Sequence, residues 1–245
     1  QSADLGQCSR EEIGNAYDEE MLGQLANGLD QLAGNAAVRA LVIRGAGKNF
    51  LAGADVSWLR RAAGYGPREA YAASIATTRT MARLNEFPKP TIAIVHGACF
   101  GGGCGLVCAV DVALATPAAS FGLTEVRVGV APTPISTHMV HAMGLRQTRR
   151  YAITGERFDA AEAQRIGLVH EVVPADAIEA RLDAVLDAIF LSAPGAITVT
   201  KHSLLGATGE ILDERQIALL AHESWMQRAT AEGQEGLAAF AEKRK

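Results

Sequence analysis

The sequence has few aromatic residues and no long apolar run. Aromatic side chains make up 5% of its 245 residues, so its core must be built mainly from Ala, Val, Leu and Ile. No stretch reaches the roughly 18 consecutive apolar residues of a membrane span, and the N-terminus lacks the basic and apolar regions of a signal peptide. Hydrophobic residues make up 49% and charged residues 20%, which is typical of a soluble globular protein with no membrane partner.

The chain also lacks a sustained run of basic residues. Its formal net charge is −4, and its basic clusters at 60–61, 146–150 and 243–245 are short. Nucleic acid is therefore not expected as a partner. Such clusters are typical of solvated surface charge, and alternatively they suit a small anionic ligand such as a nucleotide phosphate.

Cysteines are few, and none has the paired CxxC spacing of a zinc site. Cys8, Cys99, Cys104 and Cys108 are interpreted as small buried thiols in a reducing compartment, so the cytoplasm is the expected location. His138 and His141 lie one helical turn apart and could form half of a metal site. No third ligand is evident, so structural or surface histidines are favoured and no metal is expected.

Strand-like apolar runs alternate with helical stretches until about residue 175. Apolar runs separated by helices predict parallel strands joined by crossovers, hence an α/β fold. The predicted strands are 38–45, 90–97, 111–116 and 168–173, and the predicted helices are 18–32, 68–84, 177–191, 195–205 and 212–228. We expect residues 1–185 to form a core that carries the site, followed by a helical region over 186–245. The helical pattern begins so early that a leading hairpin is not expected.

A cluster of glycines follows the second predicted strand, in the stretch HGACFGGGCGLVCAVD (residues 96–111). It has neither the GxGxxG spacing of a dinucleotide-binding loop, nor a Gly-Lys-Ser/Thr phosphate loop, nor the Gly-x-Ser/Cys-x-Gly of a nucleophile elbow. Glycines between a strand and a helix leave backbone N–H groups approachable at the positive end of the helix, and such donors suit an oxyanion. The alternatives are close packing of helix on strand, and a nucleophilic Cys104 with no evident local base.

A second turn of small residues, in KNFLAGADVSWL (residues 48–59), follows the first predicted strand. AGADV and VHGACFGGG resemble the two signatures of the enoyl-CoA hydratase/isomerase (crotonase) family. The resemblance continues through FGLTEVRVGVAP, TGERFDAAEAQRIGLVHEVV and EGLAAFAEKRK. It implies a spiral of ββα turns, a C-terminal helical trimerisation region, and a homotrimer or dimer of trimers. It also implies an acyl-CoA thioester as substrate, with no separate cofactor because coenzyme A is part of that substrate.

The resemblance also implies roles for particular residues. The backbone N–H groups of Ala54 and Gly102 would form an oxyanion hole for the thioester oxygen, and Glu125, in F-G-x-x-E, would be the catalytic acid and base. Phe240 and Lys243 match positions that reach the CoA of a neighbouring subunit. Taken alone, Phe240 is more typical of an apolar helix face and Lys243 of a solvated C-terminal tail. The substrate and CoA would contact Ala52, Ala54, Asp55, Val56, Ser57, Gly101 and Gly102.

Gly105 occupies the position at which many hydratases of this family carry a first catalytic glutamate. A single glutamate suffices for syn addition of water, and also for moving a double bond from β,γ to α,β. The missing carboxylate favours a Δ3,Δ2-enoyl-CoA isomerase. GGGCGLVCAVD and Pro-x-x-Ile-Ser at 132–136 instead resemble a bacterial branch of methylglutaconyl-CoA and isohexenylglutaconyl-CoA hydratases, in which glycine would open room for a second carboxylate. We favour a hydratase; the alternatives are an isomerase, other thioester chemistry and a non-catalytic acyl-CoA-binding protein.

Overall fold

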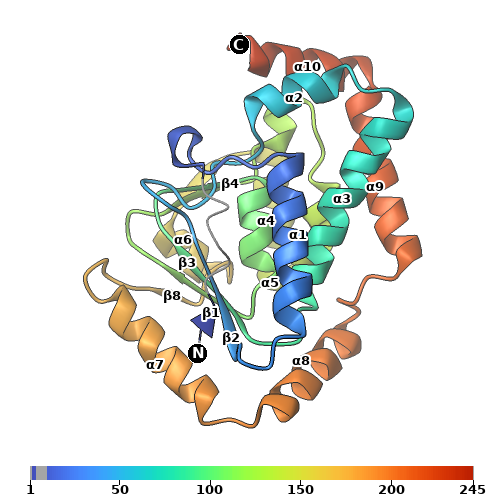
Figure 1. Cartoon of the computed structure of the whole chain (residues 1–245). Coiled ribbons are helices and arrows are strands. Elements are labelled where there is room, and N and C mark those ends of the chain that lie inside the picture. Colours follow the sequence, from blue (N-terminus) through green and yellow to red (C-terminus); the bar gives the residue numbers. More distant parts are fainter. Residues whose placement is uncertain (1, 4–9, 245) are drawn as a thin grey trace.

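A five-stranded parallel sheet has the strand order β1-β2-β3-β5-β8. Figure 1 labels β1, β2, β3 and β8 of this sheet. The structure is a computed structural model that describes residues 2–3 and 10–244. The four predicted strands are confirmed, the last of them as only two residues. The strands of this sheet are β1 (Ser2–Ala3), β2 (Ala40–Arg44), β3 (Thr91–Val95), β5 (Val112–Ala115) and β8 (Glu171–Val172).

Both faces of this sheet are covered, which explains why its strands are continuous apolar runs. Alternate residues of β3 point to opposite faces: Ala93 and Val95 join the larger core, whereas Ile92 and Ile94 join a smaller one with α7. The helices that pack on the larger core include α1 (Glu19–Ala33), α3 (Pro67–Asn85), α4 (Gly102–Cys108), α5 (Ser136–Thr154) and α6 (Ala160–Arg165). The smaller core is closed by α7 (Ile178–Phe190).

A second, three-stranded sheet continues the strands of the first. β4 (Ala98–Phe100) and β6 (Ser120–Gly122) are parallel, and β7 (Arg157–Asp159) is antiparallel to β6. The chain therefore runs from β3 through β4 into α4, and from β5 through β6 towards α5. These repeats are the predicted turns of a ββα spiral.

Three helices end the chain, and the last two of them pack back over the core. They are α8 (Pro194–Thr208), α9 (Glu214–Ala229) and α10 (Ala231–Ala241), and they confirm the helical C-terminal region. α9 packs along α3, and α10 packs on α2 (Val56–Ala63), as Figure 1 shows near the C-terminus. α10 also contacts the 3-10 helix η2 (Glu125–Val128). A Cβ on Gly236 would lie 2.5 Å from the Val128 carbonyl oxygen, so glycine permits this close approach.

Two expectations concern residues outside the described part of the chain. The expected absence of a leading hairpin involves residues 4–9, and Cys8 is one of them. Within residues 2–3 and 10–244, no single helix is long and apolar enough to cross a membrane. Only α7 and α8 taken together are long and apolar enough for a span, and the two helices are bent by 99° relative to each other.

Candidate active site

In the turn after β2, the backbone N–H of Ala54 makes no hydrogen bond to the neighbouring segment at Tyr17. Ala54 forms an isolated parallel bridge with Tyr17, in which the Tyr17 amide bonds the Gly53 carbonyl (2.9 Å) and the Asp55 amide bonds the Tyr17 carbonyl (2.8 Å). A parallel bridge of this kind uses the groups on either side of the bridged residue. The Ala54 N–H is therefore left without a backbone acceptor among the described residues, as expected for an oxyanion donor.

The glycine turn before α4 provides the second candidate donor. Gly101 adopts φ 54° and ψ −121°, a conformation accessible in practice only to glycine, and α4 begins at Gly102. As the first residue of the helix, Gly102 has an amide with no intrahelical acceptor. Backbone bonds from Leu51 to Ala98 (3.0 Å) and from Phe100 to Leu51 (3.0 Å) tie this turn to the first one. The two predicted donors therefore lie on neighbouring segments.

Each glycine of the turn makes room for a different group. A Cβ on Gly101 would lie 3.0 Å from Glu125 Oε1, and one on Gly102 would lie 2.7 Å from the Tyr17 ring. A Cβ on Gly103 would lie 2.8 Å from the Leu51 carbonyl oxygen. The groups that approach the three glycines are thus the Glu125 carboxylate, the Tyr17 ring and the Leu51 carbonyl of the first turn. The same glycines can therefore allow close packing and leave amides free for an oxyanion.

Glu125, at the start of η2, places a buried carboxyl group in the wall between the two turns. Its Oε2 atom is shielded from solvent and has no hydrogen-bond partner among the described residues. Burial raises the pKa of Glu125 to about 7 from its ordinary 4.5, although a backbone hydrogen bond opposes the shift. A carboxyl group with a pKa near neutrality can both accept and deliver a proton at physiological pH.

These groups line one cavity of about 330 Å³. Ala52, Ala54, Gly101, Gly102 and Glu125 contribute to its wall, together with residues of α3, α9 and α10. The structure adds to the sequence prediction that segments of α3, α9 and α10, distant in the chain, meet around the Glu125 carboxyl group and the Ala54 and Gly102 amides. Such a cavity can bind an acyl compound whose carbonyl oxygen gains negative charge during reaction.

The residues predicted to contact CoA are only partly brought together. Phe240 lines the cavity of its own chain because α10 folds back over α2, and its contact with a neighbouring subunit's CoA stays a prediction. Asp55, Val56, Ser57 and Lys243 are outside the cavity lining: Asp55 is buried and the other three are exposed.

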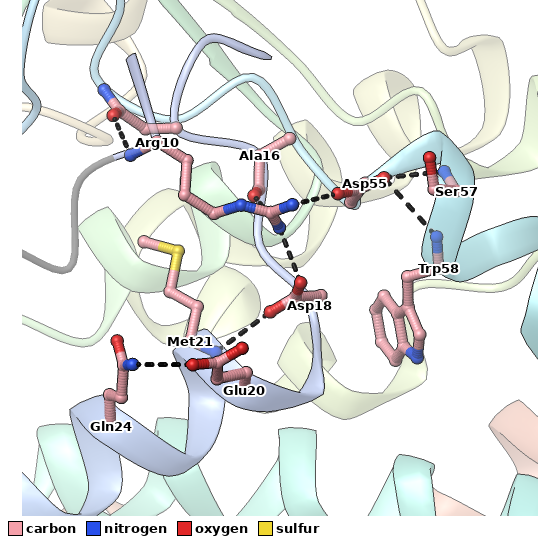
Figure 2. A network of polar contacts seen from close by, with 10 residues as sticks. Arg10, Ala16, Asp18, Glu20, Met21, Gln24, Asp55, Ser57 and Trp58 are labelled. Atoms are coloured by element: carbon pink, nitrogen blue, oxygen red, sulfur yellow. Dashed lines mark hydrogen bonds and ion pairs between the residues drawn. The ribbon is translucent and has the colours of Figure 1, made fainter. Parts of the chain in front are cut away.

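Asp55 instead fixes the turn that carries Ala54. Figure 2 shows its carboxylate at the start of α2, where it accepts hydrogen bonds from the amides of Ser57 (2.6 Å) and Trp58 (3.4 Å). Arg10 forms an ion pair with it at 2.6 Å and pairs with Asp18 at 2.7 Å. Burial alone would raise the pKa of Asp55, but the Ser57 amide and the Arg10 guanidinium lower it overall. This carboxylate is a helix cap, a role that the AGADV motif did not reveal.

We expect Asp55→Ala to lower the free energy of unfolding by about 2–3 kcal/mol at pH 7, because a helix cap and a half-buried ion pair are lost together. Denaturant titration measures this loss. Asp213→Ala, which removes the exposed cap of α9, is the matched control and should cost about 1 kcal/mol. Since the pKa of Asp55 is lowered in the folded protein, its contribution should fade as the pH falls through that pKa. Equal losses in the two variants would contradict this role.

The position of Gly105 is filled rather than open. A Cβ on Gly105 would lie 2.3 Å from Ile135 Cγ2 and 2.8 Å from Ile135 Cβ. Ile135 is buried, lies just before α5 and also lines the cavity. The hypothesis that glycine opens room here is therefore wrong: an aliphatic side chain occupies the space next to the helix.

The cysteines of the glycine stretch are structural. Cys99, Cys104 and Cys108 are buried free thiols, which confirms that part of the prediction. Cys104 Sγ donates to the Cys99 carbonyl oxygen at 3.1 Å, and burial raises the pKa of the Cys99 and Cys108 thiols well above the ordinary value. These environments disfavour a thiolate nucleophile.

The two histidines of α5, His138 and His141, lie in different environments. His138 is fully buried with no partner for either ring nitrogen among the described residues, and burial lowers its pKa to about 4. His141 Nδ1 lies 3.4 Å from Glu210 Oε1. Within residues 2–3 and 10–244, no three His, Cys, Asp or Glu side chains form a group that could hold a metal ion.

Tyr17 and Arg228 of the cavity wall were not predicted from the sequence. Neither belongs to a recognisable motif, and both reach the site through contacts with distant segments. Burial and the charge of Glu125 raise the pKa of Tyr17, whereas Arg228 lowers it. Tyr17 therefore lies within the electrostatic influence of both charged groups.

Known proteins resemble this chain in sequence and in fold. The family described as enoyl-CoA hydratase/isomerase matches residues 7–245. An enoyl-CoA hydratase structure from Shewanella pealeana is 37% identical, with a TM-score of 0.79 over 96% of this chain and 88% of that one. One from Mycobacterium avium is 33% identical, with a TM-score of 0.83 over 96% and 88%. The 2,3-dehydroadipyl-CoA hydratase of Escherichia coli is 31% identical over 94% of this chain and 88% of its own length. The chain therefore belongs to the enoyl-CoA hydratase/isomerase family and has the crotonase fold.

Proposed function

We propose that the protein adds water across the α,β double bond of a 2-enoyl-CoA thioester, with Glu125 as its single catalytic carboxylate. The observation that carries this proposal is the position of Glu125, whose Oε1 lies against the Gly101 turn and whose pKa is raised to about 7 by burial. The Ala54 and Gly102 amides, which have no backbone acceptor among the described residues, support an oxyanion hole beside it. Coenzyme A enters as part of the substrate, and the mechanism requires no further cofactor.

In the proposed mechanism, the thioester oxygen accepts hydrogen bonds from the Ala54 and Gly102 amides. The Glu125 carboxylate takes a proton from water, and the resulting hydroxide adds to C3 while the electrons of the double bond move onto the thioester oxygen as an enolate. The protonated Glu125 then delivers the same proton to C2, giving a 3-hydroxyacyl-CoA and restoring the carboxylate. Preorganised amide donors at such an enolate contribute about 10²–10³-fold each.

A Δ3,Δ2-enoyl-CoA isomerase is the second candidate, and it has an observation in its favour. Glu125 is the one carboxylate among the described residues that line the cavity, and Ile135 fills the space beside Gly105. One carboxylate suffices to remove a proton from C2 of a 3-enoyl thioester and return it at C4. The same scaffold without turnover would be an acyl-CoA-binding protein.

The substrate class of the hydratase is proposed more narrowly as a branched or glutaconyl-type thioester that carries a second carboxylate. Two similarities support this choice. Residues 101–111 and 132–136 resemble the glutaconyl-CoA hydratase branch, and the relative from Escherichia coli is named for a carboxylated enoyl-CoA.

We also propose a homotrimer or a dimer of trimers, assembled through the C-terminal helices. α8 has no buried residue in the single chain, and Val199 and Leu204 on it are 66% and 63% exposed. Burying this apolar surface between subunits would stabilise the assembly. Light scattering coupled to size-exclusion chromatography should give three or six chain masses; a monomer would contradict the proposal.

The reaction is tested by the mass of the product. Purified protein is incubated separately with a 2-enoyl-CoA and with a 3-enoyl-CoA of equal chain length, and the products are separated by liquid chromatography and mass spectrometry. The proposal expects the 2-enoyl thioester to gain one water. Conversion of the 3-enoyl thioester at unchanged mass, with no water added to the 2-enoyl thioester, would establish the isomerase instead. Binding of both without turnover would establish the non-catalytic protein.

A further inference from the structure

Arg228 places a largely buried guanidinium in the wall of the cavity. It lies near the end of α9 and faces α3, where its Nη2 donates to the Ser74 hydroxyl and to the Ala70 carbonyl oxygen at 3.5 Å. Its Nε donates to the Ser224 carbonyl oxygen at 3.4 Å. Ser74 and Ser224 line the same cavity, so this part of the wall is polar.

This guanidinium has no carboxylate partner. Among residues 2–3 and 10–244, none has a carboxylate oxygen within 4.0 Å of Arg228, and no side chain or carbonyl accepts a hydrogen bond from its Nη1. Burial lowers its pKa, since the charged form loses hydration. Burying a charge without a counter-ion is unfavourable, and a neutral hydroxyl and two carbonyl groups compensate only in part.

A second buried donor at the cavity wall has no partner. Trp58 is 3% exposed, lines the cavity, and its indole Nε1 has no acceptor among the described residues. Trp58 packs in one cluster with Ala73 of α3, next to the Ser74 that binds Arg228. The wall of the cavity therefore contains two N–H donors without an acceptor, on side chains that pack beside Ala73 and Ser74 of α3, so this part of the wall has more hydrogen-bond donors than acceptors.

The catalytic carboxyl group is a separate feature of the cavity. Glu125 makes no ion pair with Arg228, and the charges of both act on the Tyr17 hydroxyl. The other two arginines of the cavity wall, Arg127 and Arg157, are exposed, so water already solvates them. Arg228 is thus the cation whose hydration has been removed and which a bound anion would stabilise most.

We propose that Arg228 binds a carboxylate at the far end of the acyl chain, so that the cavity selects thioesters of α,ω-dicarboxylic acids over thioesters that end in a methyl group. This inference rests on the proposed function for the position of the thioester beside Ala54 and Gly102. The planar guanidinium suits a carboxylate because two parallel N–H donors can face its two oxygens. Arg228 is a specificity-determining residue here and takes no part in the proton transfers.

Binding of saturated thioesters tests the proposal without any reaction. Succinyl-, glutaryl- and adipyl-CoA are titrated calorimetrically against butyryl-, pentanoyl- and hexanoyl-CoA. The wild-type protein should bind at least one carboxylated thioester about 10- to 100-fold more tightly than its methyl-ended partner, and Arg228→Met should abolish that preference. Arg157→Met, which removes an exposed arginine of the same cavity, is the matched control and should retain it.

A structural role for Arg228 predicts a different result. If its bonds to Ser74 and Ala70 only hold α9 against α3, Arg228→Met would weaken binding of both kinds of thioester equally, and that result overturns the proposal. Absence of a preference in the wild-type protein for every pair overturns it as well. If Arg228→Met does not fold, Arg228→Lys should keep part of the preference and Arg228→Gln none. Failure of the protein to hydrate any 2-enoyl thioester would refute the proposed reaction while leaving this binding result intact.

Discussion

Glu125→Gln is expected to reduce hydration of a 2-enoyl-CoA by about 10²–10⁴-fold, with little change in the Kd of a saturated acyl-CoA. The amide keeps the shape of the side chain against the Gly101 turn but can neither accept the proton of water nor deliver one to C2. Stopped-flow absorbance of the enoyl thioester measures the rate, and calorimetry measures the binding.

The same substitution is expected to stabilise the protein above pH 7. Burial raises the pKa of Glu125 from 4.5 to about 7, so the folded protein holds a proton that the unfolded chain releases between these values. The free energy of unfolding contributed by this group is therefore lost as the pH rises from 4.5 through 7. Glutamine is neutral at every pH, so Glu125→Gln should gain about 1–3 kcal/mol at pH 8, and the gain should vanish near pH 4.5.

Glu223→Gln on α9 is the matched control because Glu223 is exposed and lies outside the cavity lining. It should alter neither turnover nor the pH dependence of unfolding. If Glu125→Gln hydrates the substrate at the wild-type rate, another group performs the proton transfers. If it loses stability at pH 8, the carboxyl group is a structural element.

Gly105→Glu is expected to destabilise the protein by about 3–5 kcal/mol. The new Cβ would lie 2.3 Å from Ile135 Cγ2, and a carboxyl group would be added to an apolar contact inside the fold. Ile135→Ala alone should also destabilise, by about 2–4 kcal/mol, because it leaves a void. The double variant should be less destabilised than the sum of the two by about 1–3 kcal/mol, since the truncated side chain makes room for the glutamate.

A double-mutant cycle measured by denaturant unfolding tests this coupling. The control cycle uses Gly23→Glu with Ile135→Ala, because a Cβ on Gly23 meets no atom within 4 Å and its effect should be additive. Ile135 lines the cavity, so the double variant Gly105→Glu/Ile135→Ala can also present a second carboxyl group there. We expect it to hydrate an unbranched 2-enoyl-CoA faster than the single glycine variant does. Strict additivity of the Gly105 cycle would show that Ile135 does not fill this position.

The long elements of the fold could be predicted from sequence because their periodicity is strong. β2, β3 and β5 are buried on both faces and read as continuous apolar runs, and α3 and α7 lie close to their predicted bounds. The second sheet could not be predicted. Its strands β4, β6 and β7 have three residues each, too few to show a period of two. β4 follows β3 directly, where Gly97 lets the chain turn from one sheet to the other at φ 56°.

The sequence indicated the two backbone turns and the Glu125 carboxyl group that line the cavity, but not the side chains that pack around them. The glycine pattern indicated approachable amides at Gly102, and AGADV indicated the neighbouring turn. The sequence did not reveal that Tyr17 contacts Gly102, that Ile135 occupies the space beside Gly105, or that Arg228 meets Ser74. Each of these contacts joins residues far apart in the chain, and no local pattern encodes which distant side chain fills a given space. The cap made by Asp55 is local, but its motif was interpreted as a ligand contact.

One measurement tests most directly the claim that a single carboxylate of raised pKa carries both proton transfers: the pH dependence of kcat/KM for hydration of a 2-enoyl-CoA between pH 5 and 9. We expect kcat/KM to be nearly constant above about pH 8, to be halved near pH 7 and to approach a tenfold fall per pH unit below about pH 6, with the slope of one ionisation, because protonated Glu125 cannot activate water. A profile that stays nearly flat down to pH 5, or an acidic limb with the slope of two ionisations, would contradict the assignment of the reaction to Glu125 alone.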